Sequence, residues 1–124
     1  MPRQKLVLYR ETAGRIPMLE WLDSLKTKAR IKCLVRLARL SELGHEIRRP
    51  EADYLRDGVY ELRARSAGVH YRMLYFFHGK CAVVVSHGFS KQRARVPFGE
   101  IEKALARKAT FEEDPVRHTF NPET

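Results

Sequence analysis

The sequence predicts an α+β fold in which helices and an antiparallel sheet occupy separate parts of one domain. A short aliphatic segment near the N-terminus is followed by about 25 residues with the apolar spacing of helices. After Pro50 the apolar residues alternate with polar ones, which is the period of strands, and a last helical stretch begins at Pro97. Helical and strand patterns therefore follow one another in blocks, as in α+β proteins.

The first half of the chain predicts one strand and two helices. The segment KLVLY at residues 5–9 is a strand, and Pro17 suits the first turn of the helix that follows. The second helix spans residues 27–43 and ends at Gly44, a residue that readily adopts the left-handed conformation. We expect its inward face to hold apolar residues at helical spacing, namely Ile31, Leu34, Val35 and Ala38, broadened by Leu37 and Leu40.

The second half predicts a three-stranded antiparallel meander and a closing helix. The strands are residues 59–65, 69–77 and 81–85, the last closing over 86–89, with turns at Asp57-Gly58, Ser66-Ala67-Gly68 and Gly79-Lys80. A basic loop over residues 90–95 leads to a helix that ends near Ala109. We expect residues 1–109 to form one domain and residues 110–124, rich in acids, to be a flexible tail that folding does not need.

Composition points to a polyanionic partner. The formal net charge is +9, and between Val59 and Arg95 seven lysines and arginines face a single acid, Glu61. The hydrophobic fraction of 44% suffices for a core without a metal or disulfide. Cys33 and Cys81 lie in apolar segments without CxxC spacing, which predicts free buried thiols. With no apolar run long enough for a bilayer and no secretory pattern at the N-terminus, we expect a cytoplasmic protein without membrane contact.

Four residues are candidates for chemistry. Arg72 interrupts an aromatic strand with no acid near it in sequence, which favours phosphate capture by its guanidinium. Arg63 is either a second phosphate ligand or a strand-edge arginine that is paired with Glu61 or left in water. Lys91, among arginines, is a base, a charge stabiliser or a solubilising loop residue. His87, at a strand end, is an acid, a base or a structural hydrogen-bonding residue.

Other polar and aromatic residues are candidates for RNA contact. They are Arg65, His70, Arg93 and Arg95. Tyr60, Tyr71 and Tyr75 either stack on bases or belong to the core, and the stripe Lys32, Arg36 and Arg39 is expected to be a solvated helix face. The five histidines lack metal-ligand spacing, so we expect neither a metal nor another cofactor.

Several segments together resemble the phage-derived, HigB-like branch of the RelE/ParE toxin superfamily. They are IPMLEWLDSL (16–25), GVYELR (58–63), HYRMLYFF (70–77), HGFSK (87–91) and PFGEIEKA (97–104), within a resemblance that spans about residues 5–108. The resemblance implies a type II toxin that cleaves mRNA, commonly on translating ribosomes, and is silenced by a helix-turn-helix antitoxin. It also implies that Arg63, Arg72 and Lys91 form the basic catalytic patch. The acidic and tyrosine-histidine cluster of the best-known HigB pattern is replaced here by small, basic and apolar residues.

This reading predicts a metal-independent endoribonuclease in which the RNA 2′-hydroxyl is the nucleophile. Two alternatives share the fold and the charge. One is a ParE-like toxin that poisons DNA gyrase by contact, and the other is an RNA-binding module without chemistry.

Overall fold

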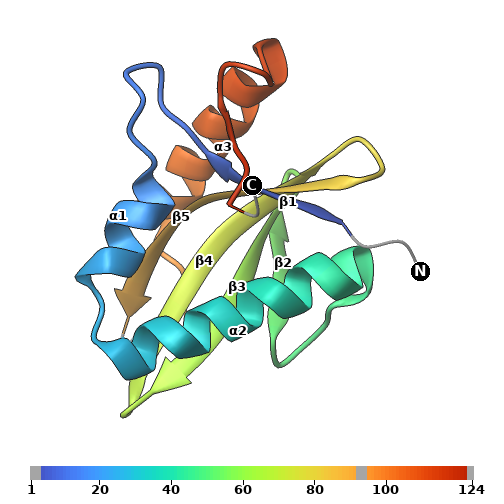
Figure 1. The fold of residues 1–124 in the computed structure, drawn as a ribbon. Helices are drawn as coiled ribbons and strands as arrows, with labels where there is room; N and C mark the ends of the chain where they lie inside the picture. Colours follow the sequence, from blue (N-terminus) through green and yellow to red (C-terminus); the bar gives the residue numbers. More distant parts are fainter. Residues whose placement is uncertain (1–3, 92–94, 123–124) are drawn as a thin grey trace.

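The computed structural model describes residues 4–91 and 95–122, and within them the chain forms a mixed α+β fold (Figure 1). Its elements in chain order are β1 (Lys5–Tyr9), α1 (Pro17–Ser24), α2 (Thr27–Leu43), the 3-10 turn η1 (Gly44–Glu46), β2 (Ala52–Arg56), β3 (Val59–Ser66), β4 (Val69–His78), β5 (Ala82–Lys91), α3 (Phe98–Glu113) and β6 (Thr119–Phe120). The strands make one sheet in the order β2-β3-β4-β5-β1-β6. The predicted fold class and the predicted order of elements are confirmed.

Tight turns build the meander from β2 to β5. Asp57 and Gly58, and then Ala67 and Gly68, all have positive φ, between 50° and 86°. Two successive residues in this conformation match the twist of the flanking strands, so each pair joins neighbouring strands directly. The sheet holds more than the predicted meander. Strand β2 pairs antiparallel with β3, and β1 pairs parallel with β5.

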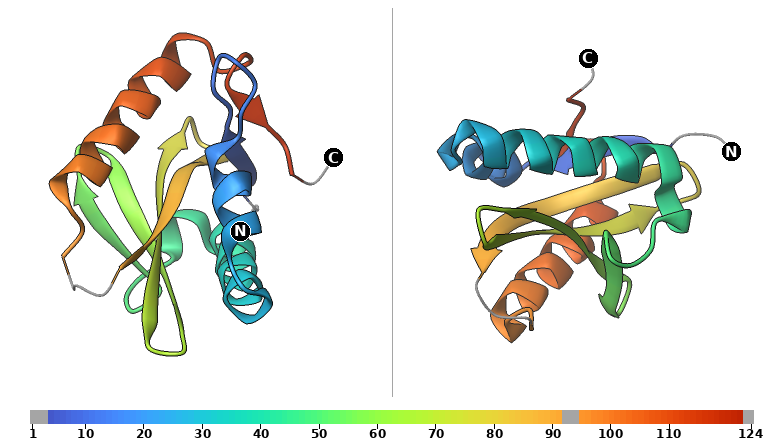
Figure 2. Two further views of the ribbon diagram at one scale, coloured as in Figure 1. Left: turned by 90° about the vertical axis from the view of Figure 1, so that its left-hand side faces the viewer. Right: turned by 90° about the horizontal axis from the view of Figure 1, so that it is seen from below.

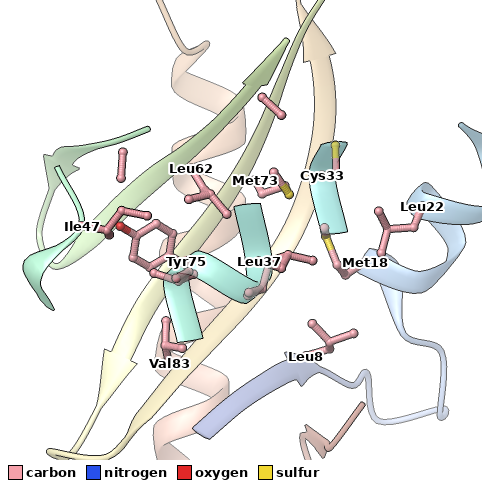
Figure 3. Close-up of a cluster of buried hydrophobic side chains, with 14 residues drawn as sticks. Leu8, Met18, Leu22, Cys33, Leu37, Ile47, Leu62, Met73, Tyr75 and Val83 are labelled. Carbon is pink, nitrogen blue, oxygen red and sulfur yellow. The ribbon is translucent and has the colours of Figure 1, made fainter. Parts of the chain in front are cut away.

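Helices cover both faces of the sheet. Helices α1 and α2 lie on one face and α3 crosses the other, as the view from below shows (Figure 2). The larger core lies under α1 and α2, where Met18, Cys33 and Leu37 meet Leu62 and Met73 of the sheet (Figure 3). Two smaller clusters lie under α3, around Phe76 and Phe111 and around Leu74 and Ala104.

The structure corrects which face of α2 is buried. Of the apolar residues that we expected to face inward, Leu37 and Leu40 are buried, but Ile31 is 52% exposed, Leu34 46% and Val35 51%. The buried residues are Ala29, Cys33, Leu37, Leu40 and Ser41. Helix α2 has two apolar stripes, and both satisfy helical spacing, so periodicity alone could not choose between them.

The C-terminal segment also differs from the expected loose tail. Helix α3 continues to Glu113, and Phe111 is 2% exposed within the core. His118 is buried and stacks on Tyr9 with 5.3 Å between ring centroids, and β6 pairs with β1. Three consecutive acids at the end of α3 made this stretch look like a solvated tail, and no periodic apolar pattern indicated the few contacts that hold it. Of the two thiols, Cys33 is buried as expected, but Cys81 is exposed.

Candidate nucleic-acid interface

The pairing register of β3, β4 and β5 gathers most of the candidate residues on the sheet face that carries α3. Residues directly opposite in antiparallel strands share a face, as do residues two apart in one strand. Two neighbouring rows across the strands are therefore cofacial: Arg65 and His70 in one, and Arg63, Arg72 and Phe89 in the other. The rows lie at the end of the meander near the β3–β4 turn, at the lower left of Figure 1.

A hollow of about 380 Å³ opens at the sheet edge beside these rows. It exists because β2 begins to pair with β3 only at Ala52, opposite Leu62, so the last residues of β3 form an open edge. Its walls come from α2, the loop before β2, β3 and β4, and consist of Arg36, Pro50, Arg63, Ala64, Arg65, His70 and Arg72. Four guanidinium groups and one imidazole thus surround a space that admits a phosphate and part of a nucleotide.

Arg72, which lines this hollow, belongs to a buried ion pair with Glu61. Arg72 is 5% exposed and Glu61 is 3% exposed, and Arg72 Nη1 donates to Glu61 Oε1. Arg63 Nε donates to the same carboxylate oxygen at 2.9 Å, and Arg63 Nη2 reaches Asp53 Oδ2 at 3.2 Å. Strand pairing therefore brings an acid to Arg72, which has none near it in sequence. Arg63 thus pairs with Glu61, which was one of the alternatives that the sequence left open for it.

The wall from α2 is also tied to the sheet. Arg36 Nε donates to the Arg63 carbonyl oxygen at 2.8 Å, and Arg36 Nη1 donates to Glu51 Oε2 at 2.9 Å. Glu51 also binds Arg39, whose hydrogen bond is the main cause that lowers the pKa of Glu51. Arg36 was expected on a solvated face, and the structure instead places it in the hollow.

His87 lies apart from the hollow, on the same sheet face beneath α3. A β-bulge makes Ser86 an extra residue in β5, because Leu74 pairs with His87 and Tyr75 with Val85. His87 Nε2 donates to Glu100 Oε1 at 2.9 Å, which leaves Nδ1 to accept from Ser86 Oγ at 2.7 Å. Burial lowers the pKa of His87 to about 4, against the opposing effect of Glu100. This imidazole is therefore neutral near pH 7, and both its nitrogens are engaged.

The remaining sequence candidates fall in three places. Lys91 ends β5 and is placed by its register position opposite His70. Arg95 is exposed before α3, and Arg93 lies outside the described residues. The tyrosines Tyr60, Tyr71 and Tyr75 all pack against the core under α1 and α2, on the face opposite the cationic rows.

Two general properties of the described residues bear on the site. Among residues 4–91 and 95–122, no three His, Cys, Asp or Glu side chains gather in a way that could hold a metal ion. Over the same ranges, none of the helices has the length and apolarity needed to span a bilayer.

Comparison with protein families identifies the family of this chain. A family model described as phage derived protein Gp49-like (DUF891) matches residues 20–109, which include every residue that lines the hollow. No curated protein matches the chain. Because the family match covers well over half of the 124 residues, the chain belongs to the phage-derived Gp49-like family, a RelE/HigB-like family of toxins in toxin–antitoxin systems.

Proposed function

We propose that the protein is the toxin of a type II toxin–antitoxin system and that it cleaves mRNA as an endoribonuclease, on RNA presented by the translating ribosome. One observation carries the proposal: four arginines and a histidine from three separate parts of the chain line one hollow at the sheet edge. Guanidinium groups bind phosphate oxygens in pairs, and the imidazole is the side chain best suited to proton transfer near neutral pH.

The cations of the hollow divide into two kinds. Arg36, Arg63 and Arg72 are held by carboxylates, which fixes their guanidinium groups in place. Arg65 is exposed and, among the described residues, has no carboxylate partner. We assign phosphate binding to Arg63 and Arg65. Carboxylates hold Arg63 in place, and Arg65 is open to solvent. Glu61 then acts as a positioning residue that orients Arg63.

The proposed reaction is an internal transesterification. The 2′-oxygen loses its proton to a base and forms a bond to phosphorus, and the bond from phosphorus to the 5′-oxygen breaks as that oxygen takes up a proton. The products are a 2′,3′-cyclic phosphate and a 5′-hydroxyl end. His70 and Lys91, paired in register, are our candidates for the two proton transfers, and the neighbouring arginines stabilise the charge on the phosphorane.

The structure favours His70 over His87 for proton transfer. His70 is half-buried and lines the hollow, whereas His87 is 5% exposed and bound at both ring nitrogens. His87 would have to leave Ser86 and Glu100 before it could reach a substrate. We therefore keep His87 as a catalytic candidate only in second place.

Cleavage can be tested with purified wild-type protein in a translation reaction programmed with a defined mRNA, by mapping new 5′ ends. His70→Gln and Lys91→Ala should each lower the single-turnover rate by about 10²-fold or more, and Arg63→Gln and Arg65→Gln should weaken RNA binding. Arg117→Gln removes the same charge from an exposed position on the far segment and should leave cleavage unchanged. Arg72→Ala is a poor first test, because it leaves Glu61 buried without its main partner.

The test also separates this function from its alternatives. Intact mRNA together with loss of gyrase supercoiling would replace the proposal by a gyrase poison. RNA binding that yields no new 5′ ends, with or without ribosomes, would leave only a binding module. The proposed antitoxin, a helix-turn-helix protein, should restore growth when it is expressed together with this chain.

A further inference from the structure

We propose that a hollow between the helices and the β3–β4 turn is a second RNA-binding subsite, which receives a nucleobase next to the RNA segment held at the sheet edge. This inference rests on the proposed binding of RNA at that edge. The hollow has a volume of about 850 Å³, against about 380 Å³ for the one at the sheet edge. It opens where the end of α1, the start of α2 and the β3–β4 turn meet, at the lower left of Figure 1. We call it the aromatic hollow.

Two aromatic side chains form one corner of the aromatic hollow. Trp21 of α1 and Tyr71 of β4 lie with 6.2 Å between ring centroids and 59° between ring planes. The six-membered ring of the Trp21 indole rests on Gly88, where an added Cβ would overlap with it. Tyr71 packs against the core, yet both side chains are only half-buried. Rings that are supported on one side and open to a hollow on the other offer a platform for a nucleobase, since every base has a flat face that stacks.

Charge favours a nucleotide as the occupant of the aromatic hollow. Lys26 and Lys28 line it, are exposed and make no ion pair among the described residues. Of the described residues that line the hollow, none is acidic, and Asp23, the acid nearest to Lys26 in sequence, does not line it. Two ammonium groups beside an aromatic corner match the phosphate and the base of a nucleotide. An apolar side chain of a protein would fill the corner but leave both cations unpaired.

A row of cations connects the aromatic hollow to the hollow at the sheet edge. Lys28, Lys32 and Arg36 are spaced four residues apart in α2, so they follow one edge of the helix. A third hollow of about 300 Å³ lies between α2 and β3, and Lys32, Arg36 and Arg65 all line it. Arg36 and Arg65 also line the hollow at the sheet edge. Because Arg36 is already bound to Glu51, the cations of this row that are available to phosphate are Lys28, Lys32 and Arg65.

The position of the aromatic hollow determines how RNA would be held. Arg65 and His70 lie on one face of the β3–β4 hairpin, and Ser66 and Tyr71, the next residues along the chain, lie on the other. RNA that is bound at the sheet edge therefore passes around the open edge of β3 to reach the corner on the face covered by α1 and α2. A base stacked there orients the segment at the sheet edge. Because stacking does not read the edges of a base, the subsite contributes affinity and orientation with little sequence preference.

Trp21 is the single tryptophan of the chain, so its fluorescence reports directly on this subsite. The full-length protein is titrated with a single-stranded RNA oligonucleotide whose 2′-oxygens are methylated, which prevents cleavage. Anisotropy of a label on the RNA measures total binding, and Trp21 emission measures occupation of the aromatic hollow. Binding to the wild-type protein should quench Trp21 emission. Abasic residues placed one at a time along the oligonucleotide should abolish the quenching at one position.

Two variants test the residues of the aromatic hollow. Tyr71→Leu removes one ring, and Lys26→Gln with Lys28→Gln removes both cations from exposed positions where folding does not need them. Each should weaken RNA binding at least fivefold while thermal unfolding shows a folded protein. The matched controls are at exposed positions that do not line the hollow, and they should leave binding unchanged. They are Tyr54→Leu, and Lys5→Gln with Lys80→Gln.

Three outcomes would overturn the subsite. One is RNA binding, seen by anisotropy, that leaves Trp21 emission unchanged or quenches it equally with every abasic oligonucleotide. Another is equal affinity of the folded lysine double variant and its lysine control. The third is Trp21 emission that responds to the antitoxin but not to RNA, because the hollow would then belong to a protein partner. Quenching and variant effects as expected, together with no new 5′ ends in the translation reaction, would support the subsite and refute only the proposed cleavage.

Discussion

The Glu61 carboxylate should be the most costly single charge to remove from this fold. It is 3% exposed and is the acid against which both Arg72, itself 5% exposed, and Arg63 are held. Glu61→Gln keeps the volume but removes the carboxylate from the buried pair with Arg72, which costs about 3–5 kcal/mol. With an unfolding entropy of about 2.1 cal/mol/K per residue over 124 residues, a loss of about 3 kcal/mol lowers Tm by about 10 °C.

Thermal unfolding at pH 7 measures this effect, with two controls. Asp53→Asn removes a carboxylate that also binds Arg63 but is more exposed, so the loss should stay below about 1 kcal/mol. The double variant Glu61→Gln with Arg72→Met removes both charges and should be more stable than Glu61→Gln alone. Equal shifts in Tm for Glu61→Gln and Asp53→Asn, or a double variant less stable than the single one, would refute the buried pair as the cause.

Three further predictions concern other parts of the fold. Between pH 6.5 and about 4, His87 binds a proton in the unfolded chain but not in the folded one, so the free energy of unfolding should fall by up to about 3 kcal/mol as the pH drops. Urea unfolding of His87→Gln should show a free energy of unfolding that depends less on pH. Gly88→Ala should cost about 1–3 kcal/mol because its Cβ would lie 2.3 Å from the Trp21 ring, whereas Gly99→Ala meets nothing within 4 Å; equal Tm values for the two would contradict the packing. Phe111→Ala should cost about 3–5 kcal/mol in denaturant unfolding, and a loss under 1 kcal/mol would restore the view of a loose tail.

Local signals in the sequence were sufficient for most element boundaries. The helix over 27–43 is confirmed at both ends. Its C-terminal end could be predicted because Gly44 readily adopts the positive φ found there. The Asp57-Gly58 and Ala67-Gly68 turns are confirmed as well, because glycine readily adopts the positive φ that each turn has at its second residue. Strand β2 was missed because it is a short edge strand whose exposed and buried residues do not alternate cleanly.

The site was only partly predictable, since its geometry depends on register. Alternation placed Arg63, Arg65, His70 and Arg72 on polar positions of two strands, and the pairing brings them together. The bond from Arg72 to Glu61 needed the register itself, because the two residues lie 11 apart in sequence and belong to adjacent strands. The place of Arg36 depended on which face of α2 is buried, and the two apolar stripes of that helix leave its orientation open.

Stability and substrate binding draw on the same arginines, and this overlap determines which variants are informative. Arg72, Arg63 and Arg36 each make ion pairs within the fold, so the loss of any of them changes the free energy of unfolding together with the charge of the hollow. Arg65 and His70 line the same hollow without an ion pair among the described residues. A fold without RNA has no need of charge or imidazole at these two positions. If Arg65→Gln or His70→Gln lowers activity at an unchanged Tm, the lost contribution therefore belongs to the substrate complex.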